Sequence, residues 1–212
     1  MKHHIRKLIE AGESQTLDFK FEISDSKKIA RTFVAFANTG GGTLLIGVKD
    51  NGAIAGVRSE EEYYMIEGAA KMYCKPEVPF QTRRWDVDGR TILELTIPKS
   101  PLKPHFALTD DKKWMVYIRV KDQNLLANNI LLRVWQQKKD KKAVFLEYSK
   151  NERTLLSYLE ENPSITISKY SKIAMISRHE AENILVKLIT LDIISMEFTE
   201  KQVYYKLKNT KP

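Results

Sequence analysis

Hydrophobic residues recur at helical spacing in the stretch SDSKKIARTFVAFANTGGG. The apolar positions on one face are Ile29, Ala30, Phe33, Val34 and Ala37. Asp25 or Ser26 is suited to cap the first turn of this helix, and the glycines at 40–42 are expected to end it. The apolar run TLLIGV then predicts a buried strand. The turn KDNG and the segment AIAGV predict that this strand returns as a hairpin.

The same alternation of patterns continues through the first part of the chain. It predicts helices at 5–11 and 60–74 and strands at 16–22, 81–87, 91–97 and 114–120. The turn between the paired strands falls at Asp88-Gly89. We therefore expect a mixed α and β domain.

A basic stretch, RVWQQKKDKK at 133–142, follows the last predicted strand. We place the domain joint near 138–150, which gives domains at 1–140 and 150–212. The stretch is expected to be a loop or a short helix. It carries Lys138, Lys139, Lys141 and Lys142, which either contact nucleic-acid phosphates or form a solvated connector.

The last part of the chain predicts three helices and a hairpin. NERTLLSYLEEN is amphipathic, SKYSKIA predicts a second helix from Ser168, and Ser177 to Glu180 is a capping box that opens a third. Strands are predicted at 193–198 and 202–207, joined by TEK. This order of elements is typical of a winged helix-turn-helix domain, so the fold class is α+β with a C-terminal winged helix.

In a helix-turn-helix the last helix enters the major groove with its N-terminal residues nearest the base edges. The candidate contacts on this helix are Arg178, His179, Glu182, Asn183 and Lys187. Lys201, at the predicted hairpin tip, is a candidate for a phosphate or the minor groove. Winged helices also mediate protein contacts, so a protein-interaction role stays open.

The formal net charge of +8 favours polyanionic partners such as nucleic acid. With 42% hydrophobic and 29% charged residues, the composition is that of a soluble globular protein. We expect a cytoplasmic protein, since no apolar run is long enough for a membrane span and the N-terminus lacks a signal-peptide core. The single cysteine, Cys74, excludes an internal disulfide.

The sequence lacks a P-loop, a His-Glu-x-x-His motif and a Gly-x-Ser-x-Gly elbow. The triple glycine follows a helix, whereas a P-loop follows a strand and ends in Gly-Lys-Ser/Thr, so ATP binding there is not expected. The histidines show no metal-binding spacing. In ESQTLDFK, strand alternation places Asp18 and Lys20 on one face, where they form either a structural ion pair or part of a site. Glu13 approaches them only if the chain bends.

Three segments carry a family resemblance: ESQTLDFK, FVAFANTGGGTLLIGVKDNGAIAGV, and KPHF followed by VYIRV. Over roughly residues 10–130 the chain resembles the Schlafen-type AlbA-like domain, which is described as DNA-binding. Bacterial members often carry a C-terminal winged helix and are described as transcriptional regulators. Some Schlafen proteins are metal-dependent endoribonucleases.

The resemblance implies a site as well as a fold. The positions matching the nuclease motif are Glu13, Asp18 and Asp50, with Lys20 beside them, and Asp18 replaces the usual glutamate. If the chain is a nuclease, the three acids are expected to bind Mg²⁺ or Mn²⁺; otherwise no cofactor is expected.

Three hypotheses follow. The preferred one is a DNA-binding transcriptional regulator, for which a homodimer would read paired half-sites. The second is an endoribonuclease that acts on tRNA or other RNA. The third is a protein-interaction module.

Overall fold

The computed structural model describes residues 2–140 and 148–208 of the chain. It divides into two compact units, Met1–Ala127 and Asn128–Pro212. The division lies before the joint expected at 138–150. The reason is that helix α4 (Asn129–Asp140), in the basic stretch, packs against α7 (Arg178–Thr190) and so belongs to the second unit.

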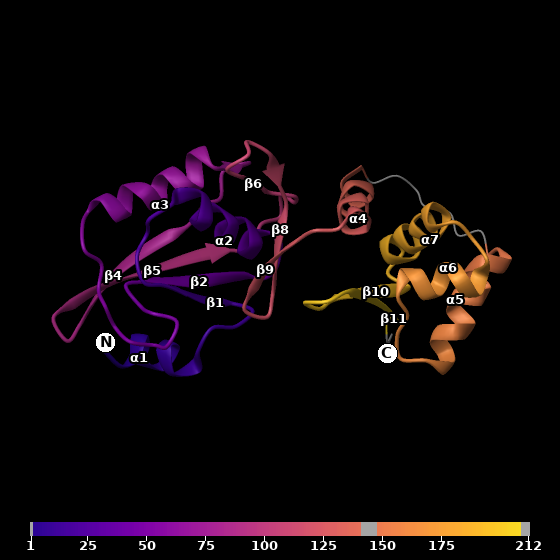
Figure 1. Ribbon diagram of the computed structural model, residues 1–212, viewed down its shortest axis with the longest axis horizontal. Helices are drawn as coiled ribbons and strands as arrows, with labels where there is room; N and C mark the ends of the chain where they lie inside the picture. The colour runs from indigo at the N-terminus through magenta and orange to yellow at the C-terminus, as the bar shows by residue number, and fades with distance from the viewer. Residues whose placement is uncertain (1, 141–147, 209–212) are drawn as a thin grey trace. The chain divides into compact units, whose positions relative to one another are not determined.

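A four-stranded sheet in the order β1-β2-β5-β4 forms the centre of the first unit (Figure 1). Strand β1 (Leu17–Lys20) runs parallel to β2 (Gly41–Ile46). Strand β5 (Arg90–Pro98) is antiparallel to both β2 and β4 (Gln81–Val87). The predicted strands at 81–87 and 91–97 are confirmed, and they meet at the predicted turn.

Helices cover both faces of this sheet (Figure 1). Helices α2 (Ser26–Asn38) and α3 (Glu61–Met72) pack on one face, and α1 (Lys2–Ala11) packs on the other. Alternation along β2 explains the two cores, because Leu44 joins the cluster under α2 and α3 while Leu45 joins the cluster with α1.

The start of α2 and the triple glycine have simple physical causes. Asp25 caps α2, since its carboxylate accepts a hydrogen bond from the Lys27 amide at 2.8 Å. The glycines begin β2 rather than form a separate loop. A Cβ at Gly42 would lie 2.5 Å from the Phe36 ring, so glycine lets β2 pass close beneath α2.

The predicted hairpin at 43–57 is wrong in its second half. The returning segment makes one β-bridge, Val48 to Ile54, and a few backbone hydrogen bonds with Gly47 and Lys49, but it forms no strand; β2 pairs with β1 and β5 instead. Gly47 and Gly56 both have positive φ, at 92° and 80°, and the chain turns away there rather than continuing as a strand.

The rest of the first unit contains short strands. β3 (Cys74–Lys75), β6 (Phe106–Leu108) and β7 (Trp114–Met115) form one small sheet, and β8 (Tyr117–Val120) pairs with β9 (Gln123–Leu126). The strand predicted at 114–120 is therefore split at Val116, whose carbonyl accepts a hydrogen bond from the Ala127 amide at 2.9 Å.

The second unit contains α4, three further helices and a hairpin. The further elements are α5 (Lys150–Glu161), α6 (Ile167–Ala174), α7, β10 (Ile194–Phe198) and β11 (Val203–Leu207). Ser177 caps α7 as predicted, accepting from the Glu180 amide at 3.1 Å. A mixed α/β unit followed by a helical unit with a C-terminal hairpin is thus confirmed.

Candidate functional site

Asp18 lies on β1, and its side chain is only 4% exposed. One of its oxygens, Oδ2, is 2.9 Å from the Lys20 ammonium. The other, Oδ1, is 3.1 Å from a guanidinium nitrogen of Arg119 on β8. Both carboxylate oxygens therefore face a cation within the protein.

Arg119 joins several segments of the first unit. Its side chain is 1% exposed and donates to the Ser14 and Leu17 carbonyls, each at 3.2 Å, and to the Asn124 side chain at 3.1 Å. Its guanidinium also lies 5.2 Å from the centre of the Phe36 ring. Sequence reasoning missed this residue. An arginine inside the apolar strand VYIRV was the available signal, because buried arginines are generally paired with a carboxylate.

The chain bends between Glu13 and Asp18, as a shared site requires. The Ser14 amide donates to the Leu17 carbonyl at 2.8 Å, and the Glu13 carboxylate accepts from the Phe19 amide at 2.8 Å. Burial and a hydrogen bond with Asp18 raise the pKa of Glu13 to about 6. Glu13 therefore keeps its proton to a higher pH than an ordinary glutamate.

Asp18 shifts in the opposite direction. Burial by itself raises the pKa of Asp18, but the hydrogen bond with Glu13 and the positive charge of Lys20 outweigh that effect. Arg119 adds a further attraction, and the pKa of Asp18 falls below its ordinary value. Asp18 is thus held as a carboxylate within an ion-pair network.

The third expected acid, Asp50, does not complete a metal site. It is exposed in the turn closed by the hydrogen bond from the Lys49 amide to the Ala53 carbonyl. Within residues 2–140 and 148–208, no three His, Cys, Asp or Glu side chains are grouped so that they could hold a metal ion. Since the oxygens of Asp18 already contact cations, Glu13, Asp18 and Asp50 do not fit the expected Mg²⁺ or Mn²⁺ site.

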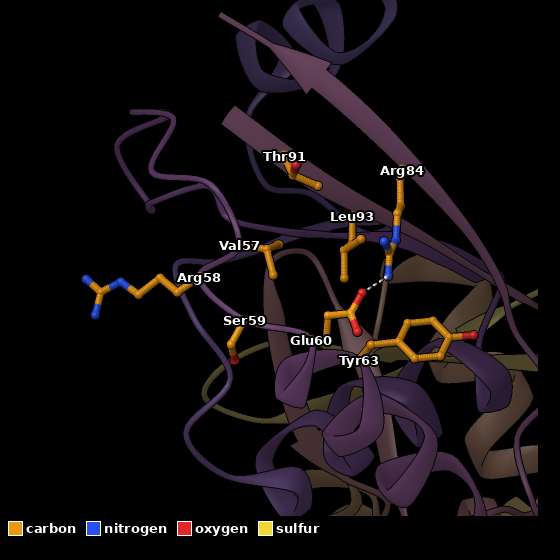
Figure 2. A pocket seen from close by; sticks show the side chains of 8 residues that line it. All are labelled: Val57, Arg58, Ser59, Glu60, Tyr63, Arg84, Thr91 and Leu93. Carbon is orange, nitrogen blue, oxygen red and sulfur yellow. Dashed lines mark ion pairs between the residues drawn. The ribbon is translucent and has the colours of Figure 1, made fainter. Parts of the chain in front are cut away.

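A shallow pocket of about 210 Å³ lies beside the start of α3 (Figure 2). Arg84 points toward Glu60, with the charged groups 3.9 Å apart, whereas the side chain of Arg58 extends away from the other lining residues. None of the site residues expected from the sequence lines this pocket.

The first turn of α7 is open to solvent. Arg178, His179 and Asn183 are exposed, while Glu182 and Lys187 are half-buried. These polar residues mostly have partners inside the second unit. Arg178 pairs with Glu182 at 3.3 Å.

Two further contacts tie α7 to neighbouring helices. The Asn183 side-chain oxygen accepts from Arg133 of α4 at 2.6 Å. Lys187 lies 3.4 Å from Glu152 of α5. The expected interface residues thus share one helix but not one free face.

The other expected basic contacts lie at separate places in the second unit. Lys201 is exposed between β10 and β11. Lys138 and Lys139 are exposed in the last turn of α4, and Lys138 pairs with Asp192 at 3.3 Å. Lys141 and Lys142 lie outside the described residues.

Comparisons with known proteins agree with the first unit. The family model described as Schlafen, AlbA_2 matches residues 13–128, more than half of the chain. No match was found among curated proteins. In the part of the chain that the structure describes, no helix has the length and apolar character needed to cross a membrane.

Similar chains occur among the solved structures. One, from Corynebacterium diphtheriae, is 19% identical with a TM-score of 0.45, and the match covers 58% of this chain but only 28% of that one. Another is the N-terminal domain of a RecG-related protein from Nitrosomonas europaea, 22% identical with a TM-score of 0.40; the match covers 59% of this chain and 95% of that domain. Residues 13–128 carry the family match, and the chain belongs to the Schlafen, AlbA_2 family.

Proposed function

We propose that this chain binds nucleic acid through its second unit and acts as a DNA-binding transcriptional regulator. One observation carries the proposal: α5, α6 and α7 lead into a β-hairpin, and the hairpin is extended by the segment between α5 and α6. The Ile165 and Tyr205 backbones exchange two hydrogen bonds, at 2.9 and 2.8 Å. Three helices with a bridging segment after the first, followed by a hairpin, are the order expected of a winged helix-turn-helix, and this order supports the proposal.

The exposed groups suit a polyanion. Arg178 and His179 occupy the first turn of α7, the part of a recognition helix that lies nearest the base edges. Lys201 is exposed in the hairpin connection, where a wing contacts phosphate or the minor groove. The net charge of +8 adds a long-range attraction to the phosphate backbone.

Membership of the Schlafen, AlbA_2 family supports nucleic acid as the partner class. Asp18 gives no comparable support for a nuclease, because its carboxylate is already ion-paired with Arg119 and Lys20. DNA binding by the second unit therefore agrees better with the geometry than metal-dependent RNA cleavage.

A titration of labelled duplex DNA by fluorescence anisotropy, repeated over a series of salt concentrations, tests the proposal. Arg178→Ala and Lys201→Ala are each expected to weaken binding about tenfold and to lower the salt slope by about one, because each removes a contact with the polyanion. Lys71→Ala is a matched control, since Lys71 is exposed on α3 in the first unit.

Two results would count against the proposal. One is a parent chain that fails to bind duplex DNA at low salt. The other is a pair of variants that bind like the parent and like Lys71→Ala. Single-stranded RNA as a competitor shows whether duplex DNA is the preferred ligand.

A further inference from the structure

Helix α4 lies along α7. Arg133 of α4 donates to the Asn183 side chain at 2.6 Å, and Thr190 of α7 donates to the Gln137 side-chain oxygen at 2.9 Å. Asn183 and Thr190 are about two helical turns apart and therefore share one face of α7. The two helices are thus in contact along most of the length of α7.

The face that α4 covers is not the one that carries most of the buried apolar residues of α7. With about 3.6 residues per turn, Ala181, Leu185 and Leu188 project from the opposite side of α7, and all three are fully buried. Val186, on the same side as Asn183 and Thr190, is also 0% exposed. It belongs to the same apolar cluster as Val134 of α4.

This arrangement conflicts with the usual use of a recognition helix. A major groove is about 12 Å wide, and a helix with its side chains is about 10–12 Å across, so the groove admits one helix by its free face. Part of this face, around Val186 and Thr190, is occupied by α4, and the exposed Asn183 is hydrogen-bonded to Arg133. Arg178, His179 and Glu180, in the first turn, remain exposed.

We propose that α4 is a displaceable cover on α7 that holds the second unit in a state of low affinity for duplex DNA. The inference rests on the proposed function, because it assigns the covered face of α7 to DNA. Displacement frees Asn183 and Thr190, whose side chains are able to hydrogen-bond with base edges. It also exposes Val186, which suits contact with a thymine methyl group.

The contacts of α4 fit a removable element. It buries two apolar residues, Ile130 and Val134, whereas α7 buries six. It also makes polar contacts with α7, of a kind that water or phosphate replaces at little cost. Lys138 and Lys139 lie at its exposed end, where a polyanion competes with the intramolecular ion pair to Asp192.

A covalent crosslink tests the proposal in the full chain. Gln137→Cys with Thr190→Cys, in a Cys74→Ala background, is joined by a short bismaleimide and compared with the same protein before crosslinking. The crosslinked chain is expected to bind duplex DNA at least tenfold more weakly. Equal affinity of the two forms overturns the proposal.

The chain offers a matched control for the chemistry. Gln136 and Asp140 are both exposed on α4 and are hydrogen-bonded at 2.9 Å, so Gln136→Cys with Asp140→Cys gives a crosslink within α4 alone. This crosslink leaves α4 free to move and is expected to leave the affinity unchanged. Val134→Ser weakens the packing of α4 and is expected to raise the affinity for duplex DNA several-fold. A variant that binds DNA more weakly than the parent counts against the proposal that α4 is a cover.

Amide hydrogen exchange separates failure of the cover from failure of the proposed function. If the uncrosslinked chain does not bind duplex DNA, the proposed function is wrong, but the cover still predicts a measurable opening. Amides of α4 should then exchange at least tenfold faster than those in the middle of α7, while α5 and α6 stay protected. If the amides of α4 and α7 are equally protected from exchange, the proposal that α4 is a displaceable cover is wrong, whatever the result of the DNA titration.

Discussion

Replacement of Arg119 by methionine tests whether the main role of Asp18, on β1, is structural. The variant keeps an unbranched side chain of similar length but removes the guanidinium that contacts Asp18 at 3.1 Å. Asp18 would then keep Lys20, whose side chain is 35% exposed, as its remaining close cation. The Ser14 and Leu17 carbonyls would each lose a donor.

The expected cost is about 4 kcal/mol of unfolding free energy. Removing one partner of a buried ion pair costs about 3–5 kcal/mol, because the remaining charge is left in a poorly solvated place. The two carbonyls would add to this, while Lys20 offsets part of it. Small domains unfold at about 5–15 kcal/mol, so the variant is expected to fold with a narrow margin.

Urea unfolding measures this cost. Trp85 and Trp114 report on the first unit if Trp135, in the second, is replaced by phenylalanine. Arg6→Met is the matched control, since its ion pair with Asp88 at 2.5 Å is exposed and is expected to contribute less than about 1 kcal/mol.

A double-mutant cycle with Asp18→Asn isolates the pairwise energy. We expect a coupling energy of about 2 kcal/mol or more between Asp18 and Arg119. Once one of the two charges is removed, the ion pair is already broken, so the second substitution costs less than it does in the parent chain. A coupling below about 0.5 kcal/mol would refute the structural assignment and would reopen a catalytic role for Asp18.

Three further predictions follow from local geometry. In Glu13→Gln the side chain is neutral at every pH, whereas the pKa of Glu13 is raised from 4.5 to about 6, chiefly by burial and the hydrogen bond with Asp18. The parent loses stability as pH rises through about 6, because Glu13 then becomes charged in a partly buried place. The free energy of unfolding of the variant should therefore exceed that of the parent by about 1 kcal/mol at about pH 7.5, after allowance for solvent screening. Burial raises the pKa of Cys74 to about 12, so iodoacetamide at about pH 8 should modify the thiol only in urea-unfolded protein. Gly42→Ala should cost about 1–3 kcal/mol, because the new Cβ meets the buried Phe36 ring at 2.5 Å.

For each of these three predictions, one result would contradict the physical reason given. A stability difference for Glu13→Gln that shrinks as pH rises contradicts the raised pKa. Alkylation of Cys74 in the folded chain at the unfolded rate contradicts its burial. Gly40→Ala is the control for Gly42→Ala, since no atom lies within 4 Å of a Cβ at Gly40, and an equal cost at both positions would refute the steric reason.

Elements with strong local signals were predictable from the sequence. Helix α7 begins at the capping box, and β4 and β5 meet at Asp88-Gly89, where both residues have positive φ. The segment after Gly52 was predicted incorrectly because strand propensity does not report which partner a strand finds. Here β2 is already paired on both edges, with β1 and β5, so no edge remains for a hairpin.

The candidate site shows the same division between local and long-range information. Alternation correctly indicated that Asp18 and Lys20 share a face, and the two are paired. Arg119 lies about a hundred residues further along the chain, and its contact with Asp18 exists only once β8 has packed beside α2. Helix α4 was missed as a partner of α7 for the same reason, since amphipathic spacing shows that a helix has an apolar face but not what covers it.

The polar residues of α7 limit how the proposed interface can gain affinity. Arg178, Asn183 and Lys187 each have an intramolecular partner, so contact with a base or a phosphate exchanges one hydrogen bond for another. Such an exchange contributes little net free energy, because the partner left behind must be solvated again. Counterion release from the DNA is not reduced in this way, and it grows with the number of lysines and arginines near the backbone. Affinity should therefore come mainly from charge, whereas sequence preference should depend on how much of α7 is freed from α4.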